Sequence, residues 1–357
     1  MMIDFTVLRR ALAGTAGALV LSLGVASRGQ ETTETKPLIV CTAVPDLADL
    51  AHEIGGDQVQ VESFTKGPQD PHFLEGRPAF IKSMSQADVW AHVGLDLEVG
   101  WAPVLLRECR NGRVQVGNPG FLDCSTAITP LDLPTGPVDR SMGDVHGFGN
   151  PHYLLDPLNG LKVAALMRDR FTQLRPAKKD YFAARYADFR KRLGIALVGE
   201  QLAAKHPDDF EKLALLQEKG KLKDFLTSVK QQDLLGGWLG KMMPYYGKKV
   251  VADHNLWPYF SRRFGLDMVG FLEPKPGLPP TTKHLGDLID RMKQAGVGAI
   301  FAAPYFDPRH AKFVSDNTGA KVAEMAHQVG SRAGTDDYLA MIDYDVRQAA
   351  SVLGGTP

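Results

Sequence analysis

Histidines are the residues of this 357-residue chain whose type and spacing could do chemistry, and four of its ten histidines stand at the ends of predicted elements. His72 precedes a predicted helix, and His152 lies where a loop passes into another helix. His254 and His327 each come just after a predicted strand. α/β folds place ligand-binding groups at such ends, and imidazole nitrogen suits Zn²⁺ and other late divalent ions. The pattern therefore predicts a metal site assembled from separate loops.

The residues around these histidines add to the case for a metal without completing a catalytic motif. A proline stands directly before His72 and before His152, and it restrains the backbone that approaches the site. Four nearby carboxylates could orient the rings as hydrogen-bond acceptors: Asp70, Glu75, Asp156 and Asp253. HExxH and CxxC motifs are absent, so each histidine taken singly could also be an ordinary core or surface residue. His146 is either a capture ligand for incoming metal or a solvated loop residue.

The composition is that of an ordinary globular protein, with 44% hydrophobic and 23% charged residues. The 41 Lys and Arg residues balance the 41 Asp and Glu residues, and there is no basic run, which argues against a nucleic-acid binder that neutralises phosphates. A single stretch is apolar enough to meet a bilayer, which excludes a protein with several membrane spans.

That apolar stretch predicts a secretory signal peptide over residues 1–27. Arg9 and Arg10 supply the positive start, residues 11–26 form the apolar run, and small residues follow at the cleavage region. The run is shorter than the roughly 20 residues of a spanning helix, which favours cleavage over an uncleaved anchor. Residues 28–36 are polar and predict a flexible start of the exported chain.

Strand and helix patterns alternate in two separate regions of the sequence. Residues 37–175 predict an N-terminal α/β lobe and residues 246–357 a C-terminal one, each with three layers and a mainly parallel sheet. Between them, residues 176–245 read as helical. Their first part, 176–202, has apolar residues at helical spacing and predicts one long linking helix. The remainder predicts a helical insertion.

Three cysteines are too few for a disulfide scaffold. Cys41 lies in an apolar run and predicts a buried thiol. Cys109 and Cys124 flank a turn-rich segment, and in an exported protein they could form a disulfide or remain two free thiols.

Four segments resemble the signatures of the zinc/manganese ABC-transporter substrate-binding proteins, solute-binding family 9, cluster A-I. The first is DPHFLEGRPAFIKSMSQADVWAHVGLDLEVGW, which begins at Asp70. GNPHYLLDP and DHNLWPYFSRRFGL are similar to the second and third signatures, and GTDDYLAMIDYDV to the C-terminal helix. The segments occur in the family's order, and the resemblance extends over nearly all of residues 37–349.

The resemblance implies two lobes joined by one rigid helix, with a metal ion held in the cleft between them. His72, His152 and His254 match the family's first three ligand positions. The fourth position is open between His327, Asp307 and a water, because the stretch that usually supplies an acidic ligand has none until much later. The chain departs from the family in two ways. It lacks the histidine-rich loop that many zinc-specific members carry. Its segment from 200 to 245 is longer than usual, and the extra residues could serve packing or contact with a partner.

The function implied is that of an exported, monomeric receptor that carries a divalent ion to a membrane ABC permease and performs no catalysis. It would work in the periplasm or at the extracytoplasmic face of the membrane, without an organic cofactor. Three or four neutral imidazoles favour Zn²⁺ over Mn²⁺, because Mn²⁺ sites usually recruit carboxylates. The alternatives are a secreted zinc-dependent hydrolase and a surface adhesin on the same scaffold.

Overall fold

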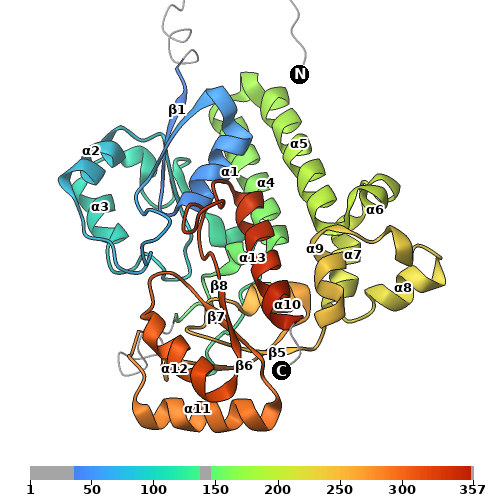
Figure 1. Ribbon diagram of the computed structural model, residues 1–357. Helices are drawn as coiled ribbons and strands as arrows, with labels where there is room; N and C mark the ends of the chain where they lie inside the picture. Colours follow the sequence, from blue (N-terminus) through green and yellow to red (C-terminus); the bar gives the residue numbers. More distant parts are fainter. Residues whose placement is uncertain (1–35, 137–145, 276, 355–357) are drawn as a thin grey trace, which may run out of the picture. The chain divides into compact units, whose positions relative to one another are not determined.

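Two four-stranded sheets, each built of parallel strand pairs, organise the computed structural model of this protein (Figure 1). The structure describes residues 36–136, 146–275 and 277–354. The predicted signal peptide and residues 28–35 lie outside this range. In the part that is described, no helix is long and apolar enough to cross a bilayer. The predicted class, two α/β lobes with parallel sheets, is confirmed.

The first sheet has the strand order β2-β1-β3-β4 and forms the N-terminal lobe. Its strands and helices are β1 (Leu38–Thr42), α1 (Pro45–Gly55), β2 (Val59–Ser63), α2 (Pro78–Gln86), β3 (Val89–His92), α3 (Ala102–Glu108) and β4 (Phe121–Asp123). β1 is buried except for the half-buried Ile39 and is apolar up to Thr42, as expected for a central parallel strand covered on both faces. α1 and α2 begin at a proline, whose missing N–H costs nothing at that position.

The second sheet has the equivalent order, β6-β5-β7-β8, and forms the C-terminal lobe. Its elements are β5 (Lys249–Ala252), α10 (Pro258–Phe264), β6 (Asp267–Phe271), α11 (Thr282–Ala295), β7 (Ala299–Ala302), α12 (Pro308–Thr318), β8 (Lys321–Glu324) and α13 (Tyr338–Leu353). In both sheets the chain leaves the first strand toward one side and later crosses to the other. This topology opens a crevice at the carboxyl ends of the strands, where ligands bind in such folds.

Two long helices, α4 (Pro157–Leu174) and α5 (Lys179–Val198), follow the N-terminal lobe and pack against α1. The prediction of a single helix over 176–202 is wrong at its end. The helix α5 stops before Gly199, and the chain continues as a second helix, α6 (Glu200–Lys205). Gly199 has a φ of 86°, and a Cβ there would lie 2.7 Å from the Cα of Gly236. This close backbone approach requires glycine and stops the helix.

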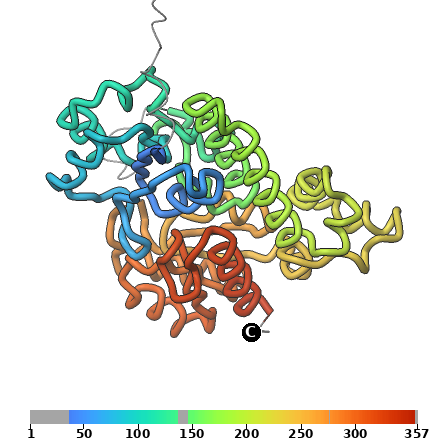
Figure 2. The backbone as a smooth tube through the Cα atoms, turned by 90° about the horizontal axis from the view of Figure 1, so that it is seen from above, coloured from blue at the N-terminus to red at the C-terminus, as the bar shows by residue number. Residues whose placement is uncertain are grey.

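The insertion consists of α6, α7 (Phe210–Glu218), α8 (Leu222–Ser228) and α9 (Gly237–Met242). Figure 2 shows the yellow part of this segment projecting to one side of the molecule. α9 packs against α5 and α13, and Arg190 of α5 pairs with Glu211 at 2.9 Å. Phe210 and Leu226 are buried and belong to the main apolar cluster of the protein, so the segment extends that core.

Buried polar contacts tie the two lobes together beside α4. Arg263 of α10 forms an ion pair with Asp156, the N-cap residue of α4, at 2.8 Å, and both side chains are more than nine-tenths buried. The hydroxyl of Tyr338 donates to the carbonyl of Leu154 at 2.6 Å. The main apolar cluster also runs through both lobes. These contacts fix one lobe against the other at the place where the loop of His152 begins.

All three cysteines are buried free thiols. Of the two alternatives for Cys109 and Cys124, the free thiols are therefore correct and the disulfide is not formed. Burial raises the pKa of Cys41 to about 12, so this thiol is inert at neutral pH.

Candidate metal centre

Four histidine rings gather where the loops of the two lobes meet: His72, His146, His152 and His254. The ring centroids of His72 lie 5.2 Å from those of His146, 5.3 Å from His152 and 6.2 Å from His254. His152 lies 5.9 Å from His254 and 6.2 Å from His146. Four imidazoles bound to one tetrahedral ion through Zn–N bonds of about 2.0–2.1 Å would have centroids about 5 Å apart. Five of the six ring pairs thus lie within about 1 Å of that spacing.

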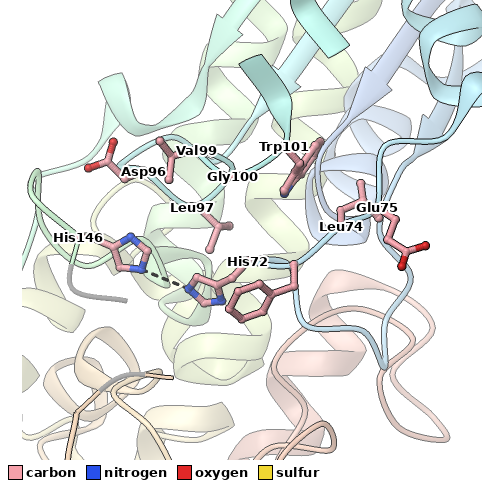
Figure 3. A pocket seen from close by; sticks show the side chains of 10 residues that line it. His72, Leu74, Glu75, Asp96, Leu97, Val99, Gly100, Trp101 and His146 are labelled. Carbon is pink, nitrogen blue, oxygen red and sulfur yellow. Dashed lines mark hydrogen bonds between the residues drawn. The ribbon is translucent and has the colours of Figure 1, made fainter. Parts of the chain in front are cut away.

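Asp70 orients the ring of His72. One carboxylate oxygen of Asp70 accepts from the backbone N–H of His72 at 2.9 Å and from its Nδ1 at 2.7 Å. Burial raises the pKa of Asp70, but the hydrogen bonds from His72 outweigh it and hold that pKa below its ordinary value. With Nδ1–H donated to a carboxylate, the Nε2 of His72 presents a lone pair, and it lies 3.2 Å from the Nε2 of His146 (Figure 3).

The loop that follows β3 supports His72 from behind. Trp101 donates its indole N–H to the carbonyl of Pro71 at 3.1 Å. The buried carboxylate of Glu98 accepts from the backbone N–H of Val93 at 2.7 Å and of Gly94 at 3.1 Å. These bonds hold the next two residues, Leu95 and Asp96, at positive φ values of 52° and 67°. Residues other than glycine seldom adopt this conformation unless the surrounding structure imposes it. Beside this loop a cavity of about 600 Å³ opens between His72, His146 and Trp101 (Figure 3).

Asn150 orients the ring of His152 in the same way as Asp70 orients the ring of His72. Its side-chain oxygen accepts from the backbone N–H of His152 at 2.9 Å and from Nδ1 at 3.0 Å. The amide nitrogen of Asn150 donates to the carbonyl of Asn255 at 2.8 Å, which links this loop to the loop of His254. The Nε2 of His152 is buried and finds no hydrogen-bond partner among the described residues. A buried nitrogen without a hydrogen-bond partner is expected of a metal ligand in a structure that contains no metal.

Glu273 orients the ring of His254, accepting from Nδ1 at 2.8 Å. The register explains the pairing, because Ala252 of β5 lies opposite Phe271 of β6, and each side chain stands two residues further on. The sequence reasoning missed Glu273, since this register is not visible in the sequence. It missed Asn150 as well, although the repeated pattern of an Asp or Asn, a Pro and a His was a signal.

Three of the four carboxylates predicted to orient rings do something else. Asp253 accepts from the backbone N–H of His254 and of Ala303. Asp156 is paired with Arg263. Glu75 is exposed and lines the cavity. Only Asp70 fulfils the prediction.

The ring of His327 stands apart from this cluster. Its Nε2 lies 3.1 Å from the carbonyl of Gln69 and 2.6 Å from the side-chain amide of Gln328, and its ring packs on Tyr305. Asp307, another predicted candidate, is the N-cap of α12 and is paired with Arg309. Neither side chain makes a ring contact or a hydrogen bond with the four clustered histidines in the described part of the chain.

The electrostatics keep the rings of His146 and His152 neutral. Burial and the neighbouring histidines lower the pKa of His152 well below its ordinary value, and they lower that of His146 to about 3. Neutral imidazoles are competent metal ligands. Among residues 36–136, 146–275 and 277–354, no group of three or more His, Cys, Asp and Glu side chains could hold a metal ion as it stands. The rings would have to move before one ion could reach their Nε2 atoms.

Comparison with known proteins places the chain in a family. The profile of the family described as zinc-uptake complex component A, periplasmic (ZnuA), matches residues 40–205 and 223–352. The metal ABC transporter substrate-binding lipoprotein FimA of Streptococcus parasanguinis is 23% identical over 339 residues, covering 94% of this chain and 96% of its own. The manganese ABC transporter substrate-binding lipoprotein PsaA of Streptococcus pneumoniae is 21% identical over 337 residues, covering 94% and 95%.

The fold agrees with solved structures of this kind. The crystal structure of ZnuA superimposes with a TM-score of 0.64 and 20% identity, covering 89% of this chain and 100% of the other. The matched ranges leave out residues 206–222, which lie in the helical insertion. The predicted resemblance is confirmed, and so is the predicted location outside the cytoplasm. The chain belongs to the family of the periplasmic zinc-uptake complex component A, whose members serve metal ABC transporters.

Proposed function

We propose that this protein captures Zn²⁺, in preference to Mn²⁺, through His72, His152 and His254 and delivers it to a membrane ABC permease. One observation carries the proposal. Each of these three rings has its Nδ1 held by an oxygen acceptor, from Asp70, Asn150 and Glu273, within 3.0 Å. This arrangement leaves the Nε2 of each ring available to a metal, and oxygen acceptors on the other nitrogen are how proteins prepare imidazoles as ligands.

Charge balance supports a divalent ion as the cargo. The carboxylates of Asp70 and Glu273 stand directly behind two of the rings and together carry two negative charges. A buried ion without such compensation would be costly. The donor set facing the ion is all nitrogen, and nitrogen favours Zn²⁺ over Mn²⁺, which prefers oxygen.

The hydrolase alternative finds no support in the same contacts. A catalytic zinc needs a general base beside its open position. Asp70 and Glu273, the carboxylates behind two of the rings, are both engaged with an imidazole N–H. Nothing in the described residues favours the adhesin alternative either.

Isothermal titration of the purified, chelator-treated protein with Zn²⁺ and with Mn²⁺ tests the proposal. We expect one Zn²⁺ per chain, bound more tightly than Mn²⁺, and a loss of several orders of magnitude when His72 and His152 are both replaced by alanine. His52→Ala is the matched control, because His52 is exposed on α1 and remote from the loops of the site. A double variant that titrates like the control would refute the assignment.

A further inference from the structure

We infer that His146 supplies the fourth ligand, so that four imidazoles hold the cargo ion and His327 holds a loop instead. The inference rests on the proposed function and specifies its site. It departs from the ligand set expected from the sequence, in which the fourth place was open between His327, Asp307 and a water.

The distance between His72 and His146 is that of two ligands on one ion. Their Nε2 atoms are 3.2 Å apart, and the edge of a tetrahedron with Zn–N bonds of about 2.0–2.1 Å is about 3.3 Å. Because Asp70 takes the Nδ1–H of His72, the hydrogen bond between the rings must be donated by His146. An arriving ion would take the place of this proton, which would move to the Nδ1 of His146 so that the ring stays neutral.

The loop of His146 is shaped to bring this ring to the site. Gly149 has a φ of 104°, and a Cβ there would lie 2.6 Å from the Cβ of Pro130. The turn at Gly149 therefore requires glycine, and it separates His146 from Asn150 and His152 by a reversal of the chain. One short segment, residues 146–152, thus places two rings 6.2 Å apart on the same cluster.

The Nε2 of His327 is engaged in a different contact, whereas its Nδ1 is buried without a hydrogen-bond partner among the described residues. Its Nε2 is engaged by Gln69 and Gln328, and the amide of Gln328 also donates to the carbonyl of Gln69 at 2.8 Å. The backbones of Gly67 and Gly330 meet so closely that a Cβ on Gly67 would lie 2.2 Å from the carbonyl carbon of Gly330. His327 is therefore a positioning residue that fixes the loop leading to His72.

The consequence concerns which ion is carried. With His146 as fourth ligand, every donor to the ion is a neutral imidazole nitrogen. Such a set disfavours Mn²⁺, which recruits carboxylates, and favours Zn²⁺ among the ions commonly available. Replacing the fourth nitrogen with an oxygen should therefore shift the preference toward Mn²⁺.

Zinc titrations against a competing chelator, together with the visible absorption of the Co²⁺ form, test the inference on the wild type, His146→Ala, His146→Asp and His327→Ala. Removing a residue that only orients a ligand typically costs 10–100-fold in affinity, so we expect His146→Ala to lose more than about 100-fold. His327→Ala should lose less and keep the four-nitrogen Co²⁺ spectrum. His146→Asp should raise the ratio of Mn²⁺ to Zn²⁺ affinity.

The outcomes separate the two proposals. A wild type that binds no Zn²⁺ would end the proposed function and this inference together. A wild type that binds Zn²⁺ while His146→Ala keeps its affinity and Co²⁺ spectrum would overturn the role of His146 alone. In that case a spectral change in His327→Ala would assign the fourth place to His327, and no change in either variant would assign it to a solvent molecule. Circular dichroism of each variant shows whether its fold is retained.

Discussion

Asp70 and Asn150 offer a paired exchange that measures what the acceptor behind a ligand ring contributes. Both side chains hold a histidine two residues further on through the same two hydrogen bonds, and they differ mainly in charge. Asp70→Ala removes both bonds and should weaken Zn²⁺ binding by about 10–100-fold, or about 1.4–2.7 kcal/mol. Asp70→Asn keeps an oxygen acceptor and loses the charge, so its loss should be smaller. Asn150→Asp adds a charge and should strengthen binding.

Competition titrations at one pH and ionic strength give the four affinities. The expected order, from tightest to weakest, is Asn150→Asp, wild type, Asp70→Asn, Asp70→Ala. Unchanged binding in Asp70→Ala would refute the idea that ring orientation matters at this site. Equal losses in Asp70→Asn and Asp70→Ala would show that charge alone, and not the hydrogen bonds, sets the affinity.

Three further perturbations follow from the contacts described above. Glu98→Ala leaves two buried N–H groups without an acceptor. It should lower the free energy of unfolding by about 2–5 kcal/mol, measured by urea denaturation. A loss of less than about 0.5 kcal/mol would contradict the role of Glu98 in holding the loop after β3. Gly199→Ala forces a Cβ onto the backbone of Gly236 at positive φ and should lower the unfolding temperature by several degrees in calorimetry, whereas an unshifted melting curve would show that the helix break has another cause. Burial lowers the folded-state pKa of His327 to about 4, so between pH 6.5 and 4 the unfolded state binds the proton more readily. Compared with His327→Gln, the metal-free wild type should lose roughly 3 kcal/mol of stability as pH falls through that window, measured by urea unfolding at several pH values; parallel pH profiles would contradict this.

The sequence predicted element positions best where local chemistry sets them. α2 and α12 each begin at a proline, because the fixed φ and the missing N–H suit the first turn of a helix. The end of the linking helix was wrong because the cause is not local. The apolar spacing continues past Gly199, and only the approach of Gly236 in three dimensions explains the break.

The site shows the same division between local and distant causes. The rings of His72, His152 and His254 could be predicted from their motifs, since each lies next to a short turn that fixes it. His327 was placed correctly at the carboxyl end of β8, but the sequence does not reveal that the loop around Gln69 meets it there. His146 and Glu273 depend on loop reversal and on strand register, which are properties of the folded chain.

The Arg263–Asp156 pair and the Tyr338–Leu154 bond lie where a clamshell motion would need a hinge. Swinging the lobes apart would break both contacts and separate two groups that are buried against each other. We therefore expect the two lobes to keep nearly the same relative orientation with and without a bound ion.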